Sequence, residues 1–308
     1  MTNRSRLFLL IIALVLLAAL APLPAAAQLK VVTSTTDLAD IAHSIGGDLV
    51  TVSHIGEGYQ DPHFIEAKPS FVLKLRDADI WAFVGLDLEI GWMPLLLDGA
   101  RNPKIRLGGS GYVDVSRVIP VLDLPSGAVD RSQGDVHPLG NPHYWLEPEN
   151  GKRIAKLFAD RFSILDTKNA AAYSGNSRHF ADSIDAIGHE LRATLAAIKG
   201  KPIIAWHASW HYFAEYTGAT IVGFMEPKPG VPPSPSHLVG IVQIMKSTGA
   251  KVIVMEPFYD RKLADFVVKN VPGAHVLILP PSVGGIPGVE SYFKLLRYDV
   301  MQLGAAVR

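Results

Sequence analysis

Short apolar runs and longer amphipathic stretches alternate along most of the chain. The runs are rich in valine, isoleucine and alanine and are bounded by glycine, proline or polar residues. That pattern is typical of strands buried on both faces. The sequence predicts such strands at residues 29–32, 50–55, 80–84 and 105–107, and again at 202–206, 219–223, 252–255 and 275–279.

Amphipathic stretches between these runs are predicted to be helices. They begin near residues 37, 70, 209, 235, 260 and 289. Strands that alternate with helices form parallel sheets covered on both faces. Because the alternation occurs in two separate series, we predict an α/β fold with two parallel-sheet lobes.

A long helical stretch separates the two series. Its apolar positions recur every three or four residues between Phe180 and Ile198, the spacing of an amphipathic helix. A helix over roughly 167–199 would be about 50 Å long at 1.5 Å per residue, enough to tie both lobes together. Gly175 and Gly188 each weaken it by about 1 kcal/mol relative to alanine, which leaves room for a kink or an earlier break.

The first 27 residues have the composition of a secretory signal peptide. Arg4 and Arg6 precede an apolar block at about 7–23, and small residues follow, up to Ala27. The block is at the short limit for crossing a bilayer, so cleavage after Ala27 is favoured over an uncleaved membrane anchor, and export to the periplasm is expected. The predicted organisation is a signal peptide at 1–27, an N-terminal lobe at 28–165, a linking helix at 166–200 and a C-terminal lobe at 201–308.

Composition excludes several classes of protein and site. The chain contains no cysteine, which excludes disulfides, thiolate metal sites and a lipid attached through an N-terminal cysteine. It has 29 basic and 29 acidic residues, and removal of the signal peptide leaves a net charge of about −2. Neither nucleic acid nor an anionic membrane surface is expected as a partner.

The most informative motif is an Asx-Pro-His triplet that occurs twice. Residues 61–63 are Asp-Pro-His, residues 141–143 are Asn-Pro-His, and an aromatic residue follows each. Each proline restricts the chain just before its histidine. A third histidine, His207, directly follows a predicted strand. Three histidines placed where loops meet regular elements suit a nitrogen-rich transition-metal site, although each alone could be an ordinary half-buried residue.

A hydrolytic metal site is the alternative from another class. His207 and His211 are four residues apart, as in zinc-protease helices, but that motif needs a glutamate directly after the first histidine as general base. Here the position is Ala208. The glycines around Ser110 do not complete a Gly-x-Ser-x-Gly elbow either. A zinc-dependent hydrolase is therefore the weaker hypothesis, and we predict a binding protein rather than an enzyme.

These motifs resemble those of the zinc- and manganese-binding solute receptors of bacterial ABC importers, a family that includes the high-affinity zinc receptors. The matching stretches are residues 61–70, 141–148, 205–213 and 254–258, and the likeness extends over essentially the whole mature chain. The resemblance implies two α/β lobes joined by one long backbone helix, with the metal in the cleft between them. His63 and His143 would come from the N-terminal lobe and His207 from the C-terminal lobe.

One position departs from the family pattern. The family usually supplies a fourth ligand, an aspartate, after the strand predicted at 275–279, where this chain has Pro280 and Pro281. The fourth position is then left to water, to an anion or to Glu256, whose other expected role is to orient an imidazole by a hydrogen bond. Glu226 is a weaker candidate for the same position.

The polar segment 123–140 is predicted to be a mobile surface loop. By resemblance it lies where many zinc receptors carry a histidine-rich insert. In this chain it is short, and His137 is its one histidine. The loop either makes first contact with the metal or has no role in binding.

Three neutral imidazoles favour Zn²⁺, because Mn²⁺ prefers carboxylate oxygens. The resemblance then implies a monomeric periplasmic substrate-binding protein that captures zinc and delivers it to the membrane permease of an ABC transporter. A periplasmic metallochaperone is a further candidate partner. The alternative within the same class is a manganese or iron receptor of the same fold.

Overall fold

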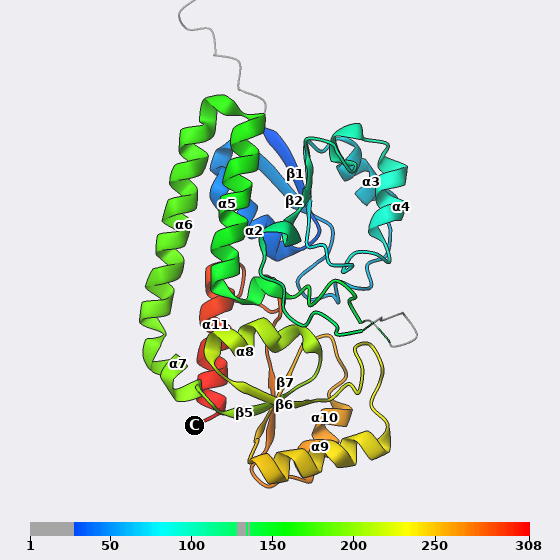
Figure 1. Cartoon of the computed structure of the whole chain (residues 1–308), viewed down its shortest axis with the longest axis vertical. Helices are drawn as coiled ribbons and strands as arrows, with labels where there is room; N and C mark the ends of the chain where they lie inside the picture. Colours follow the sequence, from blue (N-terminus) through cyan, green and yellow to red (C-terminus); the bar gives the residue numbers. More distant parts are fainter. Residues whose placement is uncertain (1–27, 128–133, 135) are drawn as a thin grey trace, which may run out of the picture.

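The computed structural model describes residues 28–127, 134 and 136–308. The predicted signal peptide at 1–27 lies outside these residues, as do residues 128–133 and 135 of the polar segment. The described chain forms two α/β lobes, with the N-terminal lobe above the C-terminal lobe in Figure 1.

The N-terminal lobe is built on a parallel sheet in the order β2-β1-β3-β4. Alternate residues of a strand face opposite ways, so Val31 packs with α2 whereas Val32 joins the cluster formed with α3 and α4. The sheet is therefore covered on both faces, as predicted. Its elements are β1 (Leu29–Thr33), α2 (Thr36–Gly46), β2 (Val50–His54), α3 (Pro69–Arg76), β3 (Ile80–Phe83), α4 (Met93–Ala100), β4 (Tyr112–Asp114) and α5 (Pro148–Leu165).

The C-terminal lobe repeats this plan with a parallel sheet in the order β6-β5-β7-β8. Ile203 packs on the side of α11, and Ile204 packs on the side of α9 and α10. Its elements are β5 (Pro202–Ala205), α8 (His211–Thr217), β6 (Thr220–Phe224), α9 (Pro235–Thr248), β7 (Val252–Met255), α10 (Lys262–Lys269), β8 (His275–Ile278) and α11 (Tyr292–Ala306).

The strand predicted at 105–107 was wrong. Residues Pro103–Ile105 form a 3₁₀ turn, and the fourth strand of the sheet is β4, where Tyr112 pairs with Trp81. Ile105 is buried, but Leu107 is 79% exposed. A single inward-facing residue, two positions after a proline, therefore gave a false strand signal.

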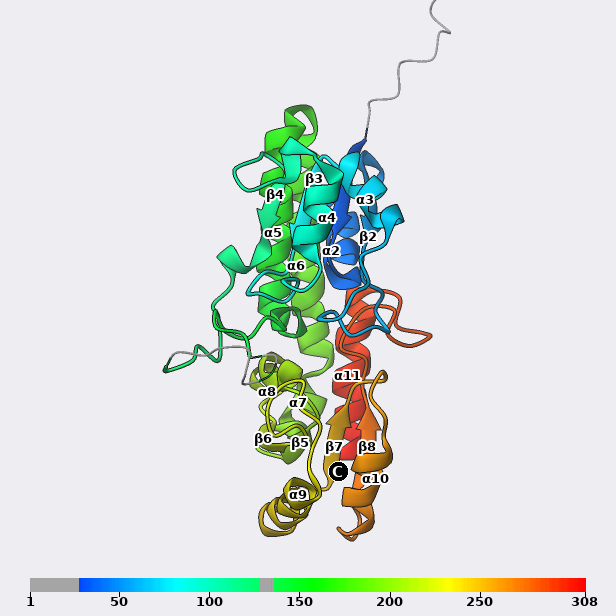
Figure 2. The ribbon, with the colours of Figure 1, turned by 90° about the vertical axis from the view of Figure 1, so that its right-hand side faces the viewer.

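The predicted linking helix is present, with an interruption near its end. The long helix α6 (Ala170–Glu190) packs against α5, and the chain then passes through Leu191 into the short helix α7 (Arg192–Ile198). The interruption lies at neither Gly175 nor Gly188. In Figures 1 and 2, α11 runs beside this connection and spans the junction as well. The lobes are therefore held together by the α6–α7 connection and by α11, rather than by one helix alone.

Polar contacts fasten the lobes beside these helices. The main-chain N–H of Val283 donates to Asp37 Oδ1 at 2.9 Å, and Thr36 Oγ1 donates to the carbonyl of Val283 at 2.7 Å. Trp145 Nε1 donates to the carbonyl of Pro281 at 2.7 Å. The segment that follows β8 is therefore used to dock the C-terminal lobe onto the N-terminal one.

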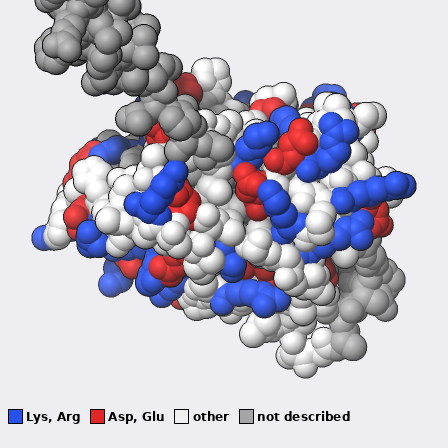
Figure 3. Space-filling model, turned by 90° about the horizontal axis from the view of Figure 1, so that it is seen from above, with Lys and Arg blue, Asp and Glu red and all other residues white. Residues whose placement is uncertain are grey.

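The exterior is consistent with the balanced composition. In the view from above, lysine and arginine side chains are interspersed with aspartate and glutamate (Figure 3). Among the residues drawn in colour on that face, neither sign forms an extended area. Within the described ranges, no helix is both long and apolar enough to cross a membrane.

Candidate metal centre

The two Asx-Pro-His triplets form the same turn. Asp61 Oδ1 accepts hydrogen bonds from the main-chain N–H of His63 at 3.0 Å and from its Nδ1 at 2.7 Å. Asn141 Oδ1 accepts the equivalent bonds from His143 at 2.9 Å and 3.0 Å. The first bond is the usual contact of an Asx side chain with the backbone two residues on. The second keeps the proton on Nδ1, which leaves Nε2 free to bind a metal.

The orientation of the Asn141 amide is fixed by its own donors. Its Nδ2 donates to Asp123 Oδ2 and to the carbonyl of Ala208, both at 2.8 Å. Both of these atoms only accept, so the amide oxygen must face His143. Because Ala208 belongs to the C-terminal lobe, the same amide also links the second turn to the opposite lobe.

His207 enters the site from the carboxyl end of β5. Its Nδ1 bonds Glu226 Oε2 at 2.7 Å, and that oxygen also accepts the N–H of Gly230 at 3.0 Å. Glu226 follows β6, which lies beside β5 in the sheet. Adjacent parallel strands bring their carboxyl ends to one edge, so the sequence folds a carboxylate against the ring. Glu226, a weak candidate ligand from sequence, orients His207 in the structure.

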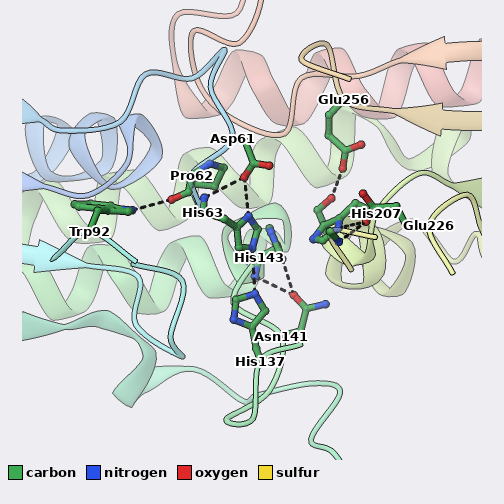
Figure 4. Close-up of polar contacts among 12 residues, drawn as sticks. Asp61, Pro62, His63, Trp92, His137, Asn141, His143, His207, Glu226 and Glu256 are labelled. Atoms are coloured by element: carbon green, nitrogen blue, oxygen red, sulfur yellow. Dashed lines mark hydrogen bonds and ion pairs between the residues drawn. The ribbon is translucent and has the colours of Figure 1, made fainter. Parts of the chain in front are cut away.

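The three predicted histidines meet between the lobes. Each of His63, His143 and His207 offers a ring nitrogen, and the three nitrogens lie within 4.8 Å of one another. Their ring centroids are 5.3–5.5 Å apart. Figure 4 shows His63 and His143 arriving from the N-terminal lobe and His207 from the other side. That the three rings come together from both lobes is what the family resemblance implied, whereas their binding of a metal stays a prediction.

The surroundings of these rings favour a positive ion. Burial, followed by the neighbouring imidazoles, lowers the pKa of His143 well below its ordinary value. Burial also opposes protonation of His207, but its hydrogen bond to Glu226 and the charge of that carboxylate raise the pKa of His207 overall. Burial would raise the pKa of Asp61, yet the hydrogen bond to His63 lowers it. Carboxylates therefore face the rings without pointing their oxygens at the centre.

Glu256 lines the same small cavity as the three histidines. Its Oε1 accepts a hydrogen bond from Ser209 Oγ, whereas its Oε2 has no hydrogen-bond partner among the described residues. Burial raises the pKa of Glu256 to about 7. It does not belong to the group of residues whose ligand atoms converge.

Two further histidines lie close to the centre and differ in direction. His211 Nδ1 bonds Asp123 Oδ2, its ring packs against Phe224, and it does not belong to the group of residues whose ligand atoms converge. His137 lies at the centre itself, with Nε2 3.0 Å from Nε2 of His63. Burial and the adjacent imidazoles lower the pKa of His137 to about 3. The role of His137 was open from the sequence, where its signal was its place just before the second triplet.

Two cavities connect the cluster with the surface. The larger, of about 720 Å³, is lined by His63, His137 and residues of the N-terminal lobe such as Phe64 and Trp92. The smaller, of about 200 Å³, lies on the side of His207. A small ion can therefore reach the histidines, and Asp61 and Glu226, which hydrogen-bond two of them, also line the smaller cavity.

Comparison with known proteins identifies a family. Residues 31–306 match the model of ZnuA, described as zinc-uptake complex component A, periplasmic. The high-affinity zinc uptake system protein ZnuA of Paracoccus denitrificans is 27% identical over 320 residues, covering 92% of this chain and 94% of that protein. The manganese ABC transporter substrate-binding lipoprotein PsaA of Streptococcus mitis and the iron ABC transporter substrate-binding lipoprotein MtsA of Streptococcus pyogenes are each 27% identical over 282 residues, covering 89% of this chain and 87% of theirs.

Solved structures share the architecture. A crystal structure of ZnuA superposes with a TM-score of 0.76 at 24% sequence identity, covering 92% of this chain and all of that one (100%). A cadmium-bound periplasmic metal binding protein from Candidatus Liberibacter asiaticus superposes with a TM-score of 0.73 at 21% identity, covering 91% and 100%. These likenesses support the two-lobed fold.

Proposed function

The chain belongs to the family of periplasmic zinc-uptake components, and from that premise we propose that it captures Zn²⁺ at His63, His143 and His207. Its relatives are substrate-binding components of metal ABC transporters, so it is a metal receptor of such an importer rather than an enzyme. The receptor delivers its ion to the permease of the transporter.

One observation carries the choice of these residues. The Nδ1 of each of the three rings is hydrogen-bonded to a side-chain oxygen, of Asp61, Asn141 or Glu226, so that each Nε2 is free to bind the metal. Such hydrogen bonds to the second ring nitrogen fix the tautomer and orientation of metal-bound histidines. Three independent elements from two lobes satisfy this requirement together, which chance burial of three histidines does not explain.

The donor set supports zinc over manganese and iron. Neutral imidazole nitrogens suit Zn²⁺, whereas Mn²⁺ prefers carboxylate and carbonyl oxygens. Two carboxylates, on Asp61 and Glu226, face the ligating rings from outside. They balance the charge of a divalent ion without supplying oxygen ligands. Because two of the relatives are named as manganese and iron binding proteins, a receptor for one of those metals is the second candidate function.

The remaining assignments complete this proposal. Residues 1–27 serve as a cleaved signal peptide, and the mature protein works in the periplasm as a monomer of two lobes at 28–165 and 201–308, linked through 166–200. A periplasmic metallochaperone is a further partner that can load it. The residue pattern supports the signal peptide and the division into lobes, and the periplasmic description of the family supports the location.

A metal titration tests the function directly. We expect the purified mature protein to bind one Zn²⁺ per chain with a Kd below about 1 μM, equivalent to a binding free energy beyond about −8.2 kcal/mol. Competition with Mn²⁺ and Fe²⁺ in the same calorimeter establishes the preference. Absence of zinc binding, or tighter binding of manganese, contradicts the proposal.

A further inference from the structure

We propose that His137 is the fourth ligand of the metal, so that four imidazoles enclose the ion and neither water nor Glu256 completes the site. The inference rests on the proposed function, because it assigns the last position of the same site. It also replaces the expectation that the loss of the aspartate at Pro280 leaves this position open.

The spacing of the rings fits a four-histidine site. Imidazoles arranged tetrahedrally at 2.0–2.1 Å from zinc have ring centroids about 5.2 Å apart. His63 lies 5.1 Å from His137, 5.3 Å from His143 and 5.5 Å from His207, and the last two are 5.3 Å from each other. The separation of His137 from His143 is larger, at 6.2 Å. An inward shift of the His137 ring by about 1 Å gives the regular arrangement.

The hydrogen bonds of His137 leave the correct nitrogen free. Its Nδ1 lies 3.1 Å from the carbonyl oxygen of Leu86, and Nδ1 of His63 lies 2.7 Å from Asp61 Oδ1. Both of these oxygens only accept, so in the neutral rings each Nδ1 carries the proton. The two Nε2 atoms, 3.0 Å apart, then direct lone pairs at each other. A cation bound between them turns this repulsion into two metal–nitrogen bonds.

The acceptor of His137 is part of a rigid turn. Leu86 and Asp87 follow β3 with φ angles of 52° and 66°, in the left-handed region that residues other than glycine rarely adopt. The buried carboxylate of Glu89 holds this turn by accepting the N–H groups of Val84 at 2.7 Å and Gly85 at 3.0 Å. The structure therefore maintains an unusual backbone conformation at the place where it orients His137.

His137 differs from the three other rings in its location. It lines the cleft of about 720 Å³ together with His63, whereas His143 and His207 do not line that cleft. It is therefore the ligand on the solvent side of the ion. A fully nitrogen-ligated site also excludes the oxygen ligands that Mn²⁺ favours, which strengthens the preference for zinc.

Cobalt substitution gives the first test. We expect the spectrum of the Co²⁺-loaded protein to be that of a tetrahedral site that azide does not change. The His137→Ala variant should still bind one ion per chain, with affinity at least about tenfold weaker, and its spectrum should respond to azide because a water now completes the site. His211→Ala is the matched control, since the Nδ1 of His211 is bonded to Asp123 and His211 lies outside the group of converging ligand atoms, and it should behave as the unaltered protein.

A second variant gives a direct spectroscopic signal if residue 137 binds the metal. His137→Cys introduces the only cysteine of the chain, so a sulfur-to-cobalt charge-transfer band in this variant arises from residue 137 alone. X-ray absorption of the zinc-loaded proteins should show four imidazoles in the unaltered protein and three in His137→Ala. Three imidazoles in the unaltered protein, or no thiolate band in His137→Cys, overturns the inference while the zinc receptor stands. Absence of zinc from the unaltered protein overturns the proposed function instead.

Discussion

The two Asx-Pro-His turns have the same internal geometry but different surroundings. In the first, the carbonyl of Pro62 accepts a hydrogen bond from Trp92 Nε1 at 3.0 Å, which ties the turn to its own lobe. In the second, Asn141 accepts a bond from Tyr212 Oη at its carbonyl, at 3.1 Å, and donates from its amide to the C-terminal lobe. The second turn is also more deeply buried, with His143 only 3% exposed.

This difference separates two tasks that the motif performs. An aspartate and an asparagine both hold the ring nitrogen, so a negative charge is not needed for that purpose. The charge of Asp61, whose side chain is 22% exposed, lies in the turn that lines both cavities, where exposure to solvent reduces the cost of burying it. The uncharged amide of Asn141, which is 5% exposed, lies at the junction of the lobes. We therefore interpret the second turn as part of the fixed frame and the first as the adjustable side of the site.

Removal of either histidine should have the largest effect. We expect His63→Ala and His143→Ala each to weaken zinc binding by more than the roughly 10–100-fold typical of residues that only orient a ligand. The loss should be greater for His143, which is held from both lobes. Competition titrations against a chelator measure the ratio, with His211→Ala as control. A larger loss for His63 than for His143 contradicts the distinction between frame and adjustable side.

Removal of the Asx side chains should separate binding from stability. We expect Asp61→Ala and Asn141→Ala each to weaken zinc binding by about 10–100-fold, because the ring loses its hydrogen-bond partner. Asn141→Ala should also lower the stability of the metal-free protein by about 1–3 kcal/mol, and by more than Asp61→Ala does, because it breaks the bond from the second turn to the carbonyl of Ala208 in the other lobe. Thermal unfolding without metal measures this difference. Equal destabilisation by the two variants argues against it.

The fold was largely predictable because buried parallel strands leave a local signature. Strand β7 has four consecutive buried apolar residues and was predicted at its observed bounds. Helix α5 was missed although its buried residues Ile154, Phe158 and Phe162 recur every four positions. Its first turn is polar, and the side chain of Glu147 caps it by accepting main-chain N–H groups. Strand β4 contributes one fully buried side chain, Val113, which is too little for a periodic signal.

The site was predictable only as far as its motifs are local. The triplets place the acceptor and the histidine two residues apart, so both can be found in one short stretch of sequence. Glu226 acts on His207 across 19 residues, and Leu86 orients His137 across 51 residues. Such pairings follow from the order of strands in the sheet and from the path of loops. No spacing rule within the sequence identifies them.

The pH dependence of zinc affinity should be governed by His207 in the C-terminal lobe rather than by His143 in the second turn. The pKa of His207 is raised, so this ring is protonated in the metal-free protein at pH values below that raised pKa, and zinc must displace the proton. Affinity should therefore fall by about tenfold per pH unit as pH drops below that raised pKa, which lies above the ordinary imidazole pKa of about 6.5. The pKa of His143 is lowered, so protons do not compete there in this range.

A substitution at the partner of His207 tests this assignment. Glu226→Gln removes the charge that raises the pKa of His207, and the fall in affinity should then begin at a lower pH. Zinc titrations between pH 5 and 8 on the two proteins give the comparison. An unchanged pH profile in Glu226→Gln shows that another ring carries the competing proton.

The smallest effect is expected from making the two turns alike. In Asp61→Asn the amide oxygen can still accept both bonds from His63, as Asn141 does for His143, so zinc affinity at neutral pH should fall by less than about tenfold.

Acid stability provides the more sensitive measurement. The folded pKa of Asp61 is below its ordinary value, so its ionised form stabilises the fold above about pH 4, and that contribution is lost as pH falls through the folded pKa. Asp61→Asn should remove this part of the acid unfolding profile, whereas Asn141→Asp should add a buried charge and lower stability at neutral pH instead. If Asp61→Asn weakens zinc binding as strongly as Asp61→Ala does, the first turn contributes through the charge of Asp61 rather than through its hydrogen bond to His63. The two turns would then support their histidines by different physical means although they share one motif.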